Sequence, residues 1–206
     1  MRFFVAVILA LVVGIKASEI EDLFVRHKVV KDVIGLSPPK LLKVSFDSGR
    51  EAFLGNILTP SEVKNKPIEL QWPTRPGSMY TVAMIDPDAP SRSNPSRREY
   101  LHWLVVNIPG TNVWQGNELV EYIGAGPPQD SGLHRYVFLV YLQDGPVVDY
   151  RIGHISKYSS SGRPMFRTQK FADKHRLGAP VAGNFFQASY DSYVPILHQQ
   201  LSGGRA

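Results

Sequence analysis

Three long apolar runs dominate the hydrophobic pattern of the chain. They span residues 80–86, 100–107 and 135–143, and polar residues interrupt them only rarely. A strand with one face in water alternates between apolar and polar positions, whereas a strand covered on both faces is apolar throughout. The three runs therefore predict central strands of a sheet that is buried between two layers.

Shorter segments predict the remaining elements. Runs bounded by turn residues predict three further strands, over residues 41–46, 68–72 and 181–188. Helical spacing or a proline in the first turn predicts three short helices, over residues 18–28, 166–175 and 191–201. With 17 glycines and 16 prolines, the chain favours a strand-rich fold over a helical bundle.

The N-terminus has the pattern of a secretory signal peptide. Arg2 supplies a positive charge, residues 3–13 are apolar, and Ala17 is a small residue suited to signal peptidase. The apolar run is shorter than the roughly 20 residues that a spanning helix needs. We predict a signal peptide over residues 1–17 and a single secreted domain over residues 18–206, without a transmembrane segment. An uncleaved anchor or a buried N-terminal helix is the alternative.

The charge of the chain is mildly basic, with a formal net charge of +5 over 206 residues. This excess does not indicate a protein that binds nucleic acid. The basic residues gather in two clusters, which are Arg92, Arg97 and Arg98, and Arg163, Arg167, Lys170, Lys174 and Arg176. We interpret both clusters as solvated faces, and contact with an anionic ligand or a membrane surface is the alternative.

Polar side chains stand at the ends of the long apolar runs or inside them. Asp86 ends the first run, His102 lies within the second, and His134 and Tyr136 begin the third. If the strands are neighbours, these side chains meet in one pocket. Imidazole N–H groups, a tyrosine hydroxyl and loop amides all donate hydrogen bonds to phosphate-type oxygens. The pattern predicts an anion site, and a turn-capping aspartate with core histidines is the alternative.

Two catalytic interpretations use the same residues. Histidine and aspartate could bind a divalent metal, but the sequence lacks HExxH or similar spacing. A serine hydrolase is the other interpretation, but no GxSxG motif is present. The chain has no cysteine, which excludes thiol catalysis and thiolate metal sites. We therefore predict a protein that is not an enzyme and that needs no metal or cofactor.

The pocket residues lie in motifs that resemble the phosphatidylethanolamine-binding protein family. The motifs cover residues 86–92 (DPDAPSR), 98–102, 124–128 and 132–136, in the order that the family has them. The likeness extends over nearly the whole chain after residue 17. Together with the signal peptide, it most resembles the secreted insect branch, which has antennal and odorant-binding members.

This resemblance implies a mainly β fold, in which a large central antiparallel sheet packs with a smaller sheet, helices lie at the periphery and a short helix ends the chain. It also implies cis peptide bonds at Ala89–Pro90 and Arg98–Glu99, and a pocket for phosphate, phosphoethanolamine or acetate-like anions. Carried over by motif, the ligand-binding residues are Asp86, Ala89, Pro90, His102, Gly126, Pro127, His134 and Tyr136.

Three rim positions depart from the pattern of mammalian members. Tyr100 stands where a tryptophan is usual, and Arg97 and His198 stand where tyrosines are usual. The core of the anion site is intact, so the departures concern what the ligand carries beyond its anionic group. Arg97 and His198 are interpreted either as attracting an acidic head group or as exposed surface.

We therefore expect a secreted, monomeric binding protein that holds a small anion or a phosphatidylethanolamine-like head group. A role as lipid or odorant carrier follows from the resemblance to the insect branch. The alternative is an extracellular protease inhibitor or an immune or signalling modulator, with a protease or a receptor as its partner.

Overall fold

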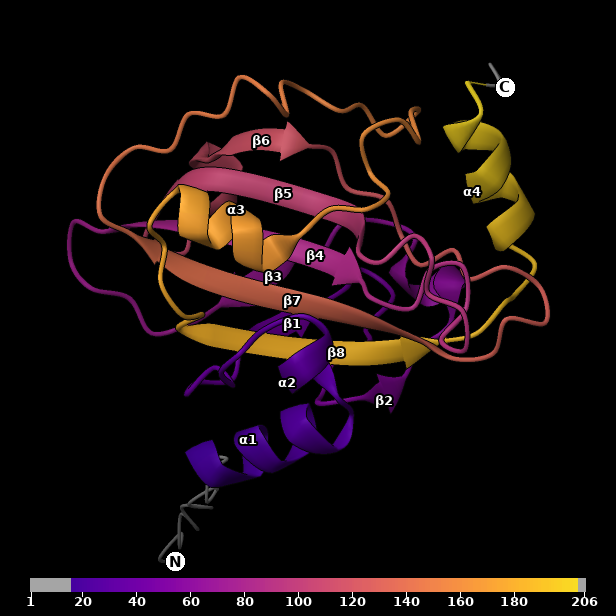
Figure 1. Ribbon diagram of the computed structural model, residues 1–206, viewed down its shortest axis with the longest axis horizontal. Helices are drawn as coiled ribbons and strands as arrows, with labels where there is room; N and C mark the ends of the chain where they lie inside the picture. Colours follow the sequence, from indigo (N-terminus) through magenta and orange to yellow (C-terminus); the bar gives the residue numbers. More distant parts are fainter. Residues whose placement is uncertain (1–15, 204–206) are drawn as a thin grey trace, which may run out of the picture.

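A six-stranded sheet forms the centre of the fold in the computed structural model, which describes residues 16–203. The strand order is β2-β8-β7-β4-β5-β6 (Figure 1). The strands are β2 (Asn56–Ile57), β4 (Met79–Asp86), β5 (Tyr100–Pro109), β6 (Asn117–Val120), β7 (His134–Gln143) and β8 (Ala182–Ala188). The signal-peptide prediction concerns mainly residues 1–15, which lie outside the described residues.

The three long apolar runs are β4, β5 and β7, which lie next to one another in the sheet. β4 pairs with both neighbours, so that Met84 lies opposite Trp103 on one side and Phe138 on the other. Nearly every residue of the three strands is buried. The prediction of central strands covered on both faces is confirmed.

Different layers cover the two faces of this sheet. A two-stranded sheet of β1 (Lys43–Ser45) and β3 (Glu69–Gln71) packs on one face, where Val44 and Leu70 join the cluster that contains Val82 and Phe138. The helices α1 (Ala17–Arg26), α2 (Val29–Asp32) and α3 (Thr168–Lys174) pack on the other face, against the alternate residues of the same strands. The predicted pair of sheets with peripheral helices is confirmed.

The edges of the large sheet differ from the prediction. β2 runs parallel to β8, so the sheet is mixed rather than fully antiparallel. The sequence did not predict β2, β6, α2 or the 3₁₀ helices Pro60–Val63 and Val113–Gln115. Each is four residues long or less, which is too short to show a period.

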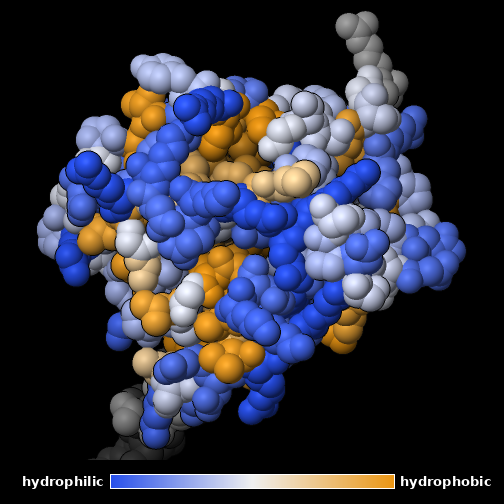
Figure 2. Space-filling view, viewed as in Figure 1, coloured by the Kyte–Doolittle hydropathy of each residue, from blue (hydrophilic) through white to orange (hydrophobic). Residues whose placement is uncertain are grey.

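The last helix, α4 (Val194–Leu201), lies beyond the end of the sheet, apart from the helices that cover its faces (Figure 1). Within residues 16–203 no helix is long and apolar enough to cross a bilayer. On the face that carries α3, hydrophilic residues surround separate apolar patches (Figure 2). The fold therefore leaves the sheet end next to α4 as the place where side chains from several elements meet.

The interpretation of residues 163–176 as a solvated face is wrong at Arg163. This side chain is completely buried, and its guanidinium donates hydrogen bonds to five backbone carbonyls. These are the carbonyls of Leu101, His102, Glu121, Ser156 and Ser159. Burial lowers the pKa of Arg163 to about 10, so the group stays charged at neutral pH. Arg163 thus fastens the start of β5 to two neighbouring loops.

Candidate functional site

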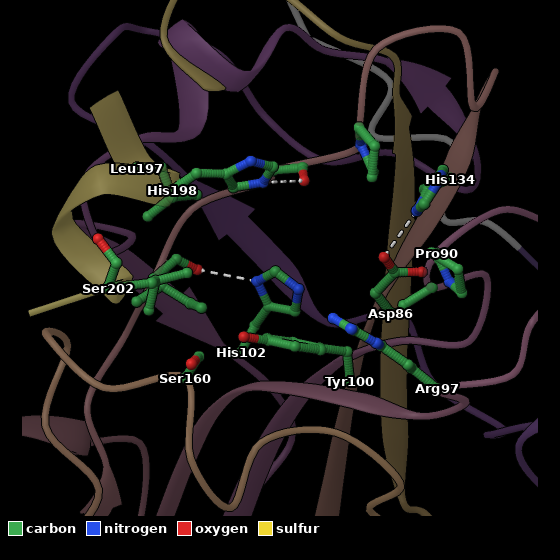
Figure 3. A pocket seen from close by; sticks show the side chains of 15 residues that line it. Asp86, Pro90, Arg97, Tyr100, His102, His134, Ser160, Leu197, His198 and Ser202 are labelled. Atoms are coloured by element: carbon green, nitrogen blue, oxygen red, sulfur yellow. Dashed lines mark hydrogen bonds and ion pairs between the residues drawn. The ribbon is translucent and has the colours of Figure 1, made fainter. Parts of the chain in front are cut away.

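A cavity of about 270 Å³ lies where the central strands end against α4 (Figure 3). Asp86 comes from the end of β4, His102 from β5 and His134 from the start of β7. The lining also includes Tyr100 at the start of β5 and residues of the loops and of α4, which are Ala89, Pro90, Arg97, Ile123, Gly126, Pro128, Ser160, Leu197, His198, Leu201 and Ser202. The structure therefore brings together most of the residues that the sequence singled out.

A β-bulge aims His102 into this cavity. Met84 of β4 lies opposite Trp103 of β5, but the next residue, Ile85, lies opposite Leu101, so His102 is the extra residue. A bulge of this kind turns a side chain away from the regular alternation of the strand and is common beside binding sites. The period of the sequence therefore could not show which face His102 occupies.

The hydrogen bonds of His102 decide what its ring presents to a ligand. Nδ1 lies 3.2 Å from the carbonyl oxygen of Ile123 and 3.0 Å from that of Gly124, so it carries the proton and donates. Burial lowers the pKa of His102 to about 4, which keeps the ring neutral at physiological pH. Nε2 is then a hydrogen-bond acceptor. The sequence analysis expected the imidazole groups to be donors, and this expectation does not hold for His102.

His134 is held by partners on both ring nitrogens. Its Nδ1 lies 2.8 Å from Oδ2 of Asp86, and its Nε2 lies 3.0 Å from Oγ of Ser131. The other carboxylate oxygen of Asp86 accepts the backbone N–H of Asp88 at 2.6 Å. Because both Asp86 oxygens are engaged, the carboxylate is fixed in place and its charge is directed at His134.

Two of the predicted residues stand behind the cavity wall instead of lining it. Tyr136 is fully buried, its ring lies edge-on to His102 at 5.2 Å, and its hydroxyl accepts the backbone N–H of Gly126. Pro127 is buried, and the next residue, Pro128, lines the cavity in its place. Tyr136 therefore supports the ring of His102 and the loop at Gly126.

The predicted rim residues differ in their exposure and in their hydrogen-bond partners. Arg97 is exposed, and its guanidinium, which extends into the cavity near Tyr100, has no hydrogen-bond or ion-pair partner among residues 16–203 (Figure 3). Tyr100 is partly buried, and burial raises the pKa of its hydroxyl. His198 donates from Nε2 to the carbonyl oxygen of Gly126 at 3.0 Å and so fastens α4 to the cavity wall. Within the part of the chain that the structure describes, Arg97 is thus the rim cation that remains available to a ligand.

Sequence reasoning did not name six of the lining residues, which are Ile123, Pro128, Ser160, Leu197, Leu201 and Ser202. Pro128 ends the 124–128 motif and Ile123 directly precedes it, so this segment was a usable signal. The others lie in α4, in the turn after it and in the 155–163 loop, and nothing in their local pattern points to a cavity.

A buried ion-pair network supports the loop that carries Ala89 and Pro90. Arg135 donates from Nε and Nη2 to the two carboxylate oxygens of Asp88, at 2.8 Å and 2.5 Å. Nη2 also donates to Asp32, and Nη1 donates to the carbonyl of His27. Burial alone would raise the pKa of Asp88, but the hydrogen bonds and charge of Arg135 outweigh it and leave this pKa lowered. Asp88 is therefore a structural residue, unlike Asp86.

Glu99 is a buried carboxyl group on the opposite side of the β5 start. It accepts hydrogen bonds from the backbone N–H and the hydroxyl of Thr168, at the beginning of α3. Burial raises its pKa to about 7, against the opposing charges of Arg167 and Arg98. The folded protein therefore binds a proton at Glu99 at a higher pH than the unfolded chain does.

Glu99→Gln is expected to remove a pH dependence of stability. Because the folded state raises the pKa of Glu99 to about 7, the carboxyl is protonated in both states below about pH 4.5 and does not oppose folding there. As the pH rises from 4.5 to 7, the unfolded chain releases this proton first, and the free energy of unfolding falls. The neutral amide avoids this cost, so the variant should gain about 3 kcal/mol relative to wild type between pH 5 and pH 8. Urea unfolding at both pH values measures it, with the exposed Glu21→Gln as control. An equal pH dependence in both proteins would contradict this account.

A family model, described as phosphatidylethanolamine-binding protein, matches residues 48–186. The chain belongs to the phosphatidylethanolamine-binding protein family. Both cis peptide bonds that the resemblance implies, Ala89–Pro90 and Arg98–Glu99, are present. The family membership agrees with the motifs at residues 86–92 and 132–136, which supply Asp86 and His134 to the cavity.

Among its relatives in the family, the Drosophila melanogaster protein named "Putative odorant-binding protein A5" is 42% identical over 176 residues, covering 85% of this chain and 83% of its own length. A solution structure of CG7054 has 43% identity and a TM-score of 0.68, covering 85% of this chain and 98% of its own. A carboxypeptidase Y inhibitor, solved in complex with its cognate proteinase, has 28% identity and a TM-score of 0.70, covering 87% and 98%. Together with the family membership, these similarities support a binding protein in the broad sense.

Within residues 16–203, no group of three or more His, Asp or Glu side chains is placed to hold a metal ion.

Proposed function

We propose that this member of the family is a secreted, non-enzymatic, monomeric protein that holds a small anion or a phospholipid head group in the cavity between β4, β5, β7 and α4. The ligand-binding residues of this proposal are Asp86, His102 and His134 at the base and Arg97, Tyr100 and His198 at the rim. Carriage of a lipid or an odorant is the physiological role proposed for it.

The observation that supports an anionic ligand is the charge around the cavity. Within residues 16–203 Arg97 is a cation without a partner at the mouth, and the buried charge of Arg163, whose partners there are backbone carbonyls, lies behind His102. Asp86 is hydrogen-bonded to His134 and to the backbone amide of Asp88, so both of its oxygens are already engaged. A volume of about 270 Å³ lies just below the range of drug-sized ligand pockets, which suits a head group rather than a whole lipid.

The acceptor atom of His102 narrows the choice among anions. A fully deprotonated anion would place its oxygen against the lone pair of Nε2, which is repulsive. A ligand with both an anionic oxygen and a hydrogen-bond donor, such as a monoprotonated phosphate or phosphoethanolamine, satisfies Arg97 and His102 together. We therefore take phosphoethanolamine as the first ligand to test.

His134→Ala is expected to weaken the binding of phosphoethanolamine by about 1–3 kcal/mol, because it leaves the Asp86 carboxylate at the cavity without its partner, and that unpartnered charge opposes an anionic ligand. Isothermal titration calorimetry measures this change. The matched control is His154→Ala, because His154 is exposed and is not among the residues that line the cavity. Equal affinity of wild type and a folded His134→Ala protein would overturn the site assignment.

Native mass spectrometry of the secreted protein, followed by lipid extraction, tests the carrier role. A stoichiometric phospholipid or small organic molecule supports carriage and identifies the cargo. N-terminal sequencing of the same sample tests the secretion proposal, for which we expect a start at or near Ser18. A start at Met1 would contradict cleavage.

Inhibition of an extracellular protease is a second candidate function. It is favoured by the likeness to the carboxypeptidase Y inhibitor, whose structure was solved with its proteinase. Residual activity of a panel of serine proteases at micromolar concentrations of the purified protein tests it. Full activity of every protease would count against inhibition and leave the binding proposal in place.

A further inference from the structure

A second concave surface lies on the other side of α4. It encloses about 560 Å³, and its lining includes Lys64, Lys66, Lys157, Trp114 and Tyr193, with Ile123 and Leu197 at its base. We call this surface the lysine groove. Ile123 and Leu197 also line the first cavity, so the two concavities lie back to back across these side chains.

The lysine groove carries uncompensated positive charge. Lys66 is neutralised, because its Nζ lies 3.1 Å from both carboxylate oxygens of Glu118. Neither Lys64 nor Lys157 has a carboxylate within 4.0 Å in the part of the chain that the structure describes. Asp47 is the acidic residue of the lining, and it accepts a hydrogen bond from Asn65 at 2.7 Å. Nζ of Lys157 lies over the ring of Tyr158 at 5.3 Å. Within the described residues the charges of Lys64 and Lys157 are therefore not neutralised by a carboxylate.

The groove also offers apolar and aromatic surface. Trp114 is 58% exposed, whereas the other two tryptophans, Trp72 and Trp103, are buried. Lys66 lies over the Trp114 ring at 5.6 Å, which keeps the indole at the groove wall. Leu197 and Ile123 provide a buried aliphatic base. Exposed tryptophan beside a concavity is a frequent ligand contact, because one flat ring buries much apolar area.

We propose that the lysine groove is a separate binding site for a small amphiphilic organic anion. The carboxylate of the ligand lies between Lys64 and Lys157, and its apolar body packs on Trp114 and the aliphatic base. The volume is within the range of small-molecule sites, and apolar walls with a few placed polar groups are typical of them. The proposal does not depend on the occupant of the first cavity.

The probe that tests this site is 4-phenylbutyrate, with the neutral 4-phenylbutanamide as its matched analogue. In ¹⁵N-labelled protein the tryptophan indole N–H of Trp114 reports on the groove and is assigned with Trp114→Phe. We expect phenylbutyrate to shift this signal and the amide to bind about tenfold more weakly, as two exposed ion pairs allow. Failure of millimolar phenylbutyrate to shift the Trp114 signal would overturn the proposal.

A double variant separates the groove from general electrostatic attraction. Lys64→Gln combined with Lys157→Gln should weaken the binding of phenylbutyrate about tenfold. Lys40→Gln combined with Lys170→Gln makes the same charge change at exposed positions outside the groove and should leave this binding unchanged. Equal losses in both double variants would overturn a specific site.

His134→Ala should leave phenylbutyrate binding unchanged. Loss of binding in that variant would place the probe in the first cavity and would also overturn the proposal.

Discussion

We expect Arg163→Met to lower the free energy of unfolding by about 5 kcal/mol, at the upper end of single-residue effects. The substitution removes one buried side chain but leaves five backbone carbonyls without their donor. A buried acceptor that loses its partner costs about 1–3 kcal/mol, and relaxation and entry of water reduce the sum. Urea unfolding at pH 7 measures the loss.

Two further variants keep this prediction testable if Arg163→Met does not fold. Arg163→Lys retains a charge and three donors, so its loss should be intermediate. Lys170→Met, at an exposed position of α3, should change stability by no more than about 0.5 kcal/mol. A loss in Arg163→Lys no larger than that of Lys170→Met would show that the five hydrogen bonds do not carry the stability assigned to them.

Asp88→Ala is expected to lower the free energy of unfolding by about 3–5 kcal/mol, because it leaves the buried guanidinium of Arg135 without its bidentate partner. Asp32 and the carbonyl of His27 remain as partners of Arg135, so the protein should still fold. Guanidinium or urea unfolding near pH 7 gives the value. Glu21→Ala, which removes an exposed acidic group from α1, is the matched control.

The pH dependence of the same pair has a defined sign. The pKa of Asp88 is lowered in the folded state, so its stabilisation is complete above the ordinary pKa of an aspartate and is lost as the pH falls through the lower folded value. The difference between wild type and Asp88→Ala should therefore shrink in acid. A difference that stays constant from pH 7 to pH 2 would contradict the ion-pair explanation.

Long apolar strands could be predicted from the sequence because their burial on both faces leaves a continuous signal. The order of β7, β4 and β5 within the sheet depends on pairing between distant residues, which no local pattern contains. The short parallel strand β2 is set by its contact with β8 at Phe186 and Gln187. Such contacts are visible only in the folded chain.

In the candidate site, too, some features could be predicted from the sequence and others could not. Asp86 and His134 stand at strand ends, where position alone suggests a pocket, and they are in contact in the structure. The acceptor role of His102 comes from the carbonyls of Ile123 and Gly124, about twenty residues further along the chain. Arg163 looked like one of several surface cations, although its five acceptors lie in three separate segments.

The side chains of Ile123 and Leu197 separate the two concavities, and this shared partition has a thermodynamic consequence. A ligand that displaces Leu197 while filling one side alters the shape of the other, and the resulting change in affinity must be equal in both directions. Saturating phosphoethanolamine would then change the dissociation constant of phenylbutyrate by the same factor that phenylbutyrate imposes on phosphoethanolamine. A chain of this size would in that case respond to the joint presence of two chemically different molecules, with α4 as the element that relates them.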